Sequence, residues 1–142
     1  MTLEWTDKLE GIDWEEVSAL FRATLGEKPA ATLKTVFGNS LYRCIVCDQG
    51  RIVGVGRALS DGIDCSYLCD IAVLPAYQGT GLGKQIVGRL VELSRGHKKI
   101  ILYAVPGKES FYGKFGFQRM KTAMAIFENQ ALAQERGYLD AP

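Results

Sequence analysis

The glycine-rich segment Gln78-Gly79-Thr80-Gly81-Leu82-Gly83 constrains the fold of this chain more than any other feature. It follows an apolar segment that ends at Pro75 and opens an amphipathic segment that continues to about Arg95. Glycine lets the backbone turn tightly and approach a ligand closely, and the N–H groups at the start of a helix attract anions. The pattern therefore predicts a strand, a phosphate-binding turn and a helix, with Lys84 as an additional positive charge. A glycine-rich turn that only begins the helix is the alternative.

The residues before this segment predict two helices and three strands. Asp13, with Glu16 three residues later, is typical of a helix start and predicts a helix over residues 14–25. Pro29 precedes a second helix, which is expected to end near residue 38. Apolar segments separated by short turns then predict consecutive antiparallel strands. These strands are expected at 41–47, 51–59 and 63–73.

The residues after it predict one crossover and a shorter C-terminal part. The helix that ends near Arg95 leads to an apolar strand at 99–104. A strand–helix–strand unit of this length is right-handed, with parallel strands. The remaining elements are expected at 109–115 (a short helix), 117–121 and 123–128 (two strands) and 129–142 (a tail with a short helix). The expected fold class is α/β, with a mixed, mainly antiparallel sheet, helices on both faces, and one domain over residues 1–142.

The charge composition argues against two classes of partner. The chain has 17 basic and 16 acidic residues and a net charge of +1, which does not favour nucleic acid or an anionic membrane surface. No apolar run approaches the ~20 residues that span a bilayer, and the first residues do not resemble a secretory leader. We therefore expect a cytoplasmic protein with neither a nucleic-acid nor a membrane partner.

The four cysteines loosely resemble a zinc-ribbon spacing, because Cys44 and Cys47 form C-x-x-C and are followed by Cys65 and Cys69. Cys44 and Cys47 lie in a strand-like segment, where residues three apart point to opposite faces, and Cys65 and Cys69, four apart, also lie in a strand-like segment. We therefore expect free thiols and no metal site, with a small structural zinc protein as a rival interpretation. The single histidine, His97, lies in a polar turn and is expected to be solvated.

Two common phosphate-binding motifs do not match the glycine-rich segment. The P-loop requires Ser or Thr after its Lys, whereas Gln85 follows Lys84, and the dinucleotide motif G-x-G-x-x-G does not fit glycines at 79, 81 and 83. The segment instead resembles the motif [Q/R]-x-x-G-x-[G/A] of the GNAT superfamily, the Gcn5-related N-acetyltransferases. The preceding strand, Asp70-Ile71-Ala72-Val73-Leu74-Pro75, and the later segment Phe111-Tyr112-Gly113-Lys114-Phe115-Gly116-Phe117 are similar to that family too. The resemblance covers residues 41–127.

This resemblance implies a GNAT-like acyl-CoA N-acyltransferase fold with splayed central parallel strands and acetyl-CoA as co-substrate. The backbone of residues 71–73 would pair with the pantetheine arm as an additional strand, and the N–H groups of residues 79–84 would hold the pyrophosphate. Ser110 and Lys108 are possible substitutes for an asparagine that many relatives carry. The expected cofactor contacts are Ile71, Ala72, Val73, Gln78, Gly79, Thr80, Gly81, Leu82, Gly83, Lys84, Ser110 and Tyr112.

The same resemblance implies a catalytic role for Tyr112, whose phenol would protonate the departing thiolate. The alternative is that Tyr112 is a packed core aromatic. Many relatives carry a glutamate on the strand before the motif, but this chain has Tyr67 at that position. Asp70 is the nearest carboxylate and a candidate for catalysis, while a purely structural carboxylate is the alternative. A water chain that ends at a backbone carbonyl, Tyr67 or Tyr103 is equally open.

The expected reaction is direct acetyl transfer from sulfur to a primary amine of a small molecule, without a covalent enzyme intermediate. The resemblance implies an acceptor pocket formed by the first two helices and the last strands, where Phe37, Met124 and Phe127, beside Tyr103, favour an amine with an apolar or flat part. An arylalkylamine, an amino sugar or a polyamine-like compound fits this expectation. A protein or peptide amine and a non-catalytic acyl-CoA sensor are the alternatives, and we expect a monomer or homodimer.

Overall fold

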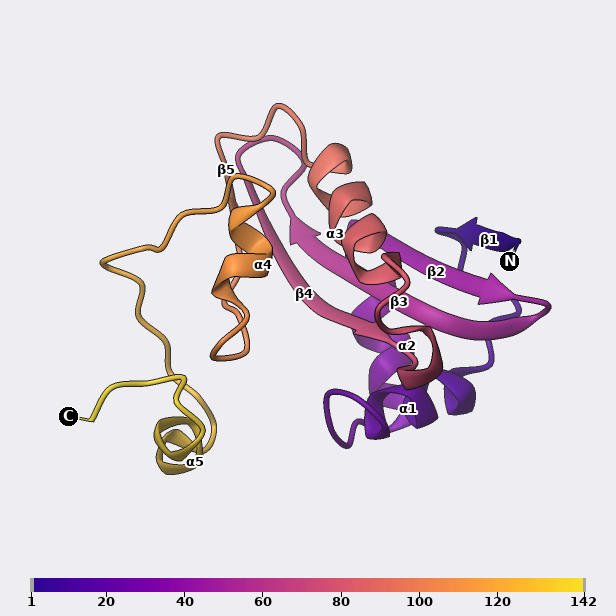
Figure 1. Ribbon diagram of the computed structural model, residues 1–142, viewed down its shortest axis with the longest axis horizontal. Coiled ribbons are helices and arrows are strands. Elements are labelled where there is room, and N and C mark those ends of the chain that lie inside the picture. The colour runs from indigo at the N-terminus through magenta and orange to yellow at the C-terminus, as the bar shows by residue number, and fades with distance from the viewer. Residues whose placement is uncertain (1, 142) are drawn as a thin grey trace. The chain divides into compact units, whose positions relative to one another are not determined.

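The computed structural model describes residues 2–141 and divides into two compact units, a first unit up to Leu102 and a second from Tyr103. The first unit contains one five-stranded sheet in the order β1-β2-β3-β4-β5 (Figure 1). Its elements in chain order are β1 (Leu3–Thr6), α1 (Trp14–Arg22), α2 (Ala30–Gly38), β2 (Tyr42–Asp48), β3 (Arg51–Ser60), β4 (Cys65–Val73), α3 (Leu82–Leu93) and β5 (Lys99–Ile101).

The sheet is antiparallel from β1 to β4 and parallel between β4 and β5. The predicted meander over β2, β3 and β4 is confirmed, as is the crossover through α3. Strand β1, which pairs with β2, was not predicted. Strand β5 ends at Ile101 rather than near residue 104.

Helices cover both faces of this sheet, as predicted (Figure 1). Helices α1 and α2 bury one apolar face against the sheet, in a core that includes Phe21, Phe37 and Val55. Helix α3 covers the opposite face, where Gly54 and Gly56 on β3 let it approach closely. A Cβ atom at Gly56 would lie only 2.6 Å from Ile86 Cγ2 on α3.

The first helix begins at the predicted cap. Asp13 accepts hydrogen bonds from the backbone N–H groups of Glu15 and Glu16, at 3.0 and 3.3 Å, and so satisfies donors that the helix itself leaves free. The Glu16 carboxylate accepts a bond from the Ile52 N–H on β3, at 2.9 Å. This bond ties the start of α1 to the sheet.

The second unit contains two short helices, α4 (Glu109–Gly113) and α5 (Gln130–Glu135). The predicted strands at 117–121 and 123–128 are wrong, since no strand occurs among residues 103–141. A strand requires a neighbouring strand for its N–H and C=O groups and a cover for one face. Within 123–128, Met124 and Ile126 are 96% and 95% exposed, so these apolar side chains lack such a cover.

Candidate functional site

Strand β4 changes register at Asp70. Cys69 lies opposite Arg57 and Ala72 lies opposite Val55, so two residues of β4, Asp70 and Ile71, face the single Gly56 on β3. Asp70 has a φ of 53°, in the left-handed region. This arrangement is a β-bulge, which bends a strand and increases its local twist.

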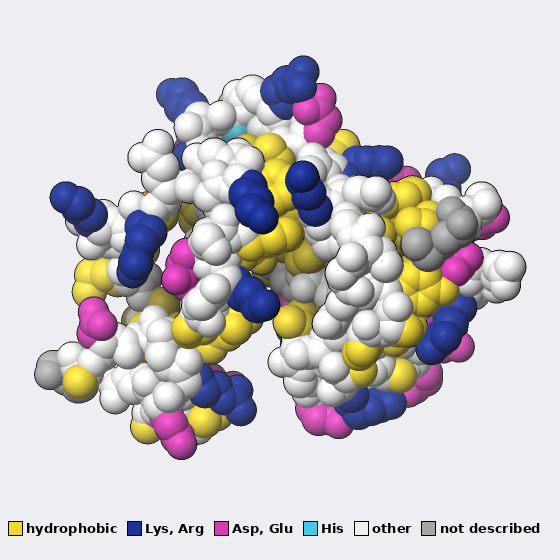
Figure 2. All heavy atoms as spheres, in the orientation of Figure 1, with side chains coloured by type: hydrophobic (Ala, Val, Ile, Leu, Met, Phe, Trp, Pro, Cys, Tyr) yellow, Lys and Arg dark blue, Asp and Glu magenta, His cyan; other side chains and the backbone are white. Residues whose placement is uncertain are grey.

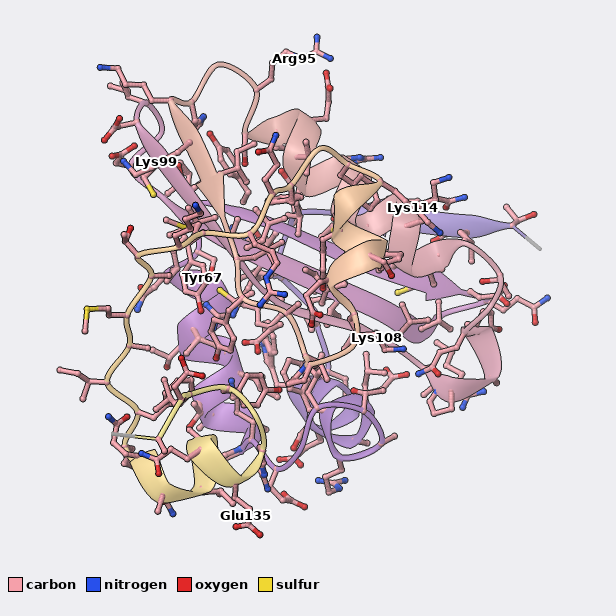
Figure 3. The ribbon with its side chains drawn as sticks, turned by 60° about the vertical axis from the view of Figure 1, so that its left-hand side comes forward. Tyr67, Arg95, Lys99, Lys108, Lys114 and Glu135 are labelled. Atoms are coloured by element: carbon pink, nitrogen blue, oxygen red, sulfur yellow. The ribbon has the colours of Figure 1, made fainter. Side chains whose placement is uncertain are left out.

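Strand β5 pairs only with the first residues of β4, so the rest of that edge of β4 has no neighbouring strand among the described residues; we call residues 71–73 of it the open edge. The two strands pair at only three positions, the last of which joins Tyr67 to Ile101; Figure 3 shows Tyr67 on this part of β4. The Leu74 N–H donates to Val53 O on β3, at 2.8 Å. Because alternate residues of a strand direct their backbone groups to opposite sides, Ile71 and Val73 direct theirs to the open edge. An extended ligand can add to such an edge as a further strand.

The glycine turn, residues 78–83, begins where this open edge ends. A single turn of 3₁₀-helix, Pro75–Tyr77, connects it to β4. Gly79 and Gly81 have φ values of 80° and 89°, which glycine adopts without strain. A residue with a Cβ atom would be strained at either position.

Side chains anchor the glycine turn at three points. Gln78 Nε2 donates to Val73 O at 2.9 Å, and Thr80 Oγ1 donates to Tyr77 O at 2.6 Å. The Tyr77 hydroxyl lies 2.5 Å from Asp48 Oδ2 at the end of β2. This bond raises the pKa of Tyr77, because the carboxylate accepts from the protonated phenol. The turn is therefore held to two strands before any ligand binds.

The glycine turn presents backbone donors to open space. The first intrahelical bond of α3 joins Gln85 N to Gly81 O, at 3.0 Å, so the N–H groups of residues 81–84 have no acceptor within the helix. A Cβ atom at Gly79 or Gly81 would meet no atom within 4 Å. The start of a helix also carries a partial positive charge, and the exposed Lys84 lies in its first turn. These features suit a diphosphate.

Tyr112 lies on α4 in the second unit, among other aromatic rings. Its ring centroid lies 5.1 Å from that of Phe111 and 6.1 Å from that of Phe117. Burial raises the pKa of Tyr112, and the phenol is protonated at neutral pH, as an ordinary tyrosine is. Lys108 and Lys114 lie just before and just after this helix (Figure 3). Ser110, on the same helix, is exposed.

The Asp70 carboxylate is held by two cations that the sequence did not reveal. Its Oδ2 accepts from Arg57 Nε at 2.7 Å and from Lys28 Nζ at 3.3 Å. These partners are 13 and 42 residues away in the chain, so no local pattern indicates them. The geometry agrees with the structural alternative for Asp70, and the open edge begins at the next residue.

Cys44 and His97, two further candidates from the sequence, lie on β2 and in the segment between α3 and β5. Cys44 is buried on β2, and burial raises its pKa to about 12. No group of three or more His, Cys, Asp or Glu side chains suited to a metal ion occurs among residues 2–141. His97 is half-buried rather than solvated, because its Nε2 lies 2.7 Å from Ser60 Oγ.

Two properties of the described residues bear on partners. Basic and acidic side chains both occur over the face shown in Figure 2. No helix in the described part of the chain is long and apolar enough to cross a membrane.

Proteins named as acetyltransferases match about half of the chain. The chain is 37% identical over 73 residues to "Histone acetyltransferase TAP1" of Glycine max, a match that covers 50% of this chain and 32% of that protein. It is 41% identical over 70 residues to "Serotonin N-acetyltransferase 2, chloroplastic" of Oryza sativa subsp. japonica, which covers 48% of this chain and 35% of that protein. The chain thus spans about a third of the length of these two relatives.

Structural similarity extends over nearly the whole chain. A probable acetyltransferase of unknown function from meticillin-resistant Staphylococcus aureus superposes with a TM-score of 0.77, at 23% identity, over 90% of this chain and 99% of that one. At this identity the similarity shows the fold alone. The family model of the acetyltransferase (GNAT) domain matches residues 40–119, more than half of the 142 residues. With the open edge and the glycine turn both inside that match, the chain belongs to the GNAT acetyltransferase family.

Proposed function

We propose that this protein is an acetyl-CoA-dependent N-acetyltransferase that moves the acetyl group directly to a primary amine of a small molecule. One observation carries the proposal, namely that the open edge at 71–73 is followed, after one turn of 3₁₀-helix, by the glycine turn at the start of α3. The edge suits the amide-bearing pantetheine arm, which can pair with a strand. The turn suits the pyrophosphate. Membership of the GNAT family supports the same donor.

The proposed reaction forms a bond between the amine nitrogen and the acetyl carbon and breaks the bond between that carbon and sulfur. The sulfur leaves as a thiolate and takes a proton from the Tyr112 hydroxyl. An ordinary phenol, with a pKa of about 10, already carries its proton at neutral pH, and burial raises the pKa of Tyr112 further, so the proton is present to be donated. Its ring contacts with Phe111 and Phe117 fix the direction of the side chain.

The attacking amine must lose a proton as well. A free alkylamine resembles lysine, with a pKa near ~10.4, so most of it is protonated at neutral pH. The candidate acceptors that the sequence offers are Asp70, Tyr67, Tyr103 and a chain of water molecules that ends at a backbone carbonyl. Among these, Asp70 already has one oxygen engaged by Arg57 and Lys28.

A small amine with an apolar or flat part is the proposed acceptor. Of the residues that suggested it, Tyr103 and Phe127 contact each other, with ring centroids 5.9 Å apart. Phe37 is 0% exposed and belongs to the core beneath α1 and α2, so it does not line an acceptor site. The net charge of +1 gives no overall attraction for a polycationic peptide.

Release of free thiol from acetyl-CoA tests the proposal. The panel contains an arylalkylamine, an amino sugar, a polyamine and a peptide with a free N-terminus. We expect one of the small amines to give the highest kcat/KM. Turnover of the peptide alone would favour a protein substrate, and tight acetyl-CoA binding without any turnover would favour a non-catalytic sensor. The cytoplasmic location and the monomeric or homodimeric state remain part of the proposal.

A further inference from the structure

The ion pairs of Asp70 connect three parts of the first unit. Arg57 lies on β3, and its Nη1 also donates to Ser40 Oγ at 3.3 Å, just after α2. Lys28 lies in the segment between α1 and α2, with its Nζ 5.5 Å from the centroid of the Phe21 ring. The side chains of Arg57, Asp70 and Lys28 are 11%, 15% and 32% exposed. The carboxylate is therefore largely shielded from solvent and is tied, through these two cations, to the segments that follow α1 and α2.

The backbone at Asp70 determines which residues of β4 face which side. Before the bulge, Ser66 faces α3, since its Oγ accepts from Ser94 Oγ at 2.8 Å. Without a bulge, Ala72 would face the same side as Ser66, because alternate residues of a strand share a face. Instead Ala72 belongs to the core beneath α1 and α2. Ile71 lies on the α3 face, since a Cβ atom placed at Gly56 would contact both Ile71, at 3.6 Å, and Ile86 of α3. The bulge thus shifts the alternation by one residue, and with it the direction of the backbone groups at the open edge.

A left-handed backbone is uncommon outside glycine, but Asp and Asn adopt it more readily than other residues. Asp70 and Gln49 are the two described non-glycine residues with a positive φ, and Gln49 lies in the tight turn between β2 and β3. At Asp70 the unusual backbone coincides with two cations on the side chain, which oppose any rotation that would straighten the strand.

We propose that Asp70 is a positioning residue rather than the proton acceptor. Its ion pairs with Arg57 and Lys28 hold the bulge that directs the backbone groups of Ile71 and Val73 to the open edge. The inference rests on the proposed function in one respect, since it takes acetyl-CoA as the ligand of that edge. It predicts that Asp70 acts on donor binding and not on proton transfer.

Two variants test this role. Asp70→Asn keeps the size of the side chain and its tolerance of left-handed backbone, and removes the charge. Lys28→Met removes the more exposed cation. We expect the calorimetric Kd for acetyl-CoA to rise about tenfold in Asp70→Asn and about threefold in Lys28→Met. The double variant should bind no more weakly than Asp70→Asn, because the negative charge that pairs with Lys28 is already absent. At saturating acetyl-CoA, kcat and its pH profile should match the wild type.

The opposite pattern would overturn the proposal. If Asp70 accepts the proton, Asp70→Asn leaves the Kd unchanged, lowers kcat by about 10² or more and removes a limb of the pH profile. Should Asp70→Asn fail to fold, Lys28→Met decides alone, and an unchanged Kd contradicts the positioning role. If the wild-type protein binds acetyl-CoA but acetylates no amine, the proposed activity fails while the Kd values still decide the role of Asp70.

Discussion

Gly56 on β3 lies where the sheet, helix α3 and the bulge of β4 meet, and replacing it with alanine tests this packing. The added Cβ would lie 2.6 Å from Ile86 Cγ2 and 3.1 Å from Leu90 Cδ1, whereas ordinary contact begins at 3.4 Å. Ile86 Cγ2 is attached directly to a Cβ atom, and χ1 of a β-branched residue in a helix has one strongly preferred value. The helix itself must shift, so we expect Gly56→Ala to lower the free energy of unfolding by about 1–3 kcal/mol.

Two matched variants and a local probe make this measurement specific. At Gly54 the closest atom is Ile86 Cδ1, at 2.9 Å, which is the flexible end of the side chain, so Gly54→Ala should cost less. At Gly38, in α2, a Cβ would meet no atom within 4 Å, so Gly38→Ala should be neutral or slightly stabilising. Denaturant unfolding followed by tryptophan fluorescence reports on the first unit, because Trp5 and Trp14 both lie there. Equal stability of Gly56→Ala and Gly38→Ala would refute the packing of α3 against β3.

Three further predictions concern single side chains. Tyr112→Phe should lower kcat by about 10²–10⁴ with little change in acetyl-CoA affinity, and a variant with the full rate would show that Tyr112 only packs. In the wild type, the activity that depends on the protonated phenol should fall only above the ordinary phenol pKa of about 10, because the pKa of Tyr112 is raised. Glu16→Ala should destabilise the fold by about 1–2 kcal/mol, since the Ile52 N–H loses its acceptor, and Glu16→Gln should restore most of the loss in the same unfolding assay. The Cys44 thiol, with its pKa raised to about 12, should resist alkylation at neutral pH until the protein unfolds, and rapid labelling of native Cys44 by mass spectrometry would contradict its burial.

The order of elements from α1 to β5 was predictable because each depends on local patterns. Asp13 lies next to the helix that it caps, and the glycines of the turn lie next to the helix that they begin. Strand β1 was not predicted, since four residues, Leu3–Thr6, are too few to show an alternation. The two predicted strands near the C-terminus are the opposite case, in which a sequence pattern is present and no strand forms. Residues at 117–128 have strand-like composition, but a strand also needs a neighbouring strand with which to form hydrogen bonds.

The parts of the candidate site that are continuous in the chain were predictable, and the contacts between distant residues were not. The sequence indicated the glycine turn and the strand before it, since both are continuous segments. It indicated Asp70 as well, but not its partners, because Arg57 and Lys28 reach it only after the sheet and the first two helices have assembled. The bulge was likewise hidden, since it is a relation between two strands and not a property of either one.

The proposal that the open edge and the glycine turn hold acetyl-CoA can be tested most directly by following the backbone amides of the isotope-labelled protein by NMR during titration with acetyl-CoA. The amides of residues 79–84 should shift in a saturable manner, because the pyrophosphate accepts from their N–H groups. Those of Ile71 and Val73, which point to the open edge, should shift with them. Saturable binding that leaves both groups of amides unmoved would contradict the account of how this chain holds its donor.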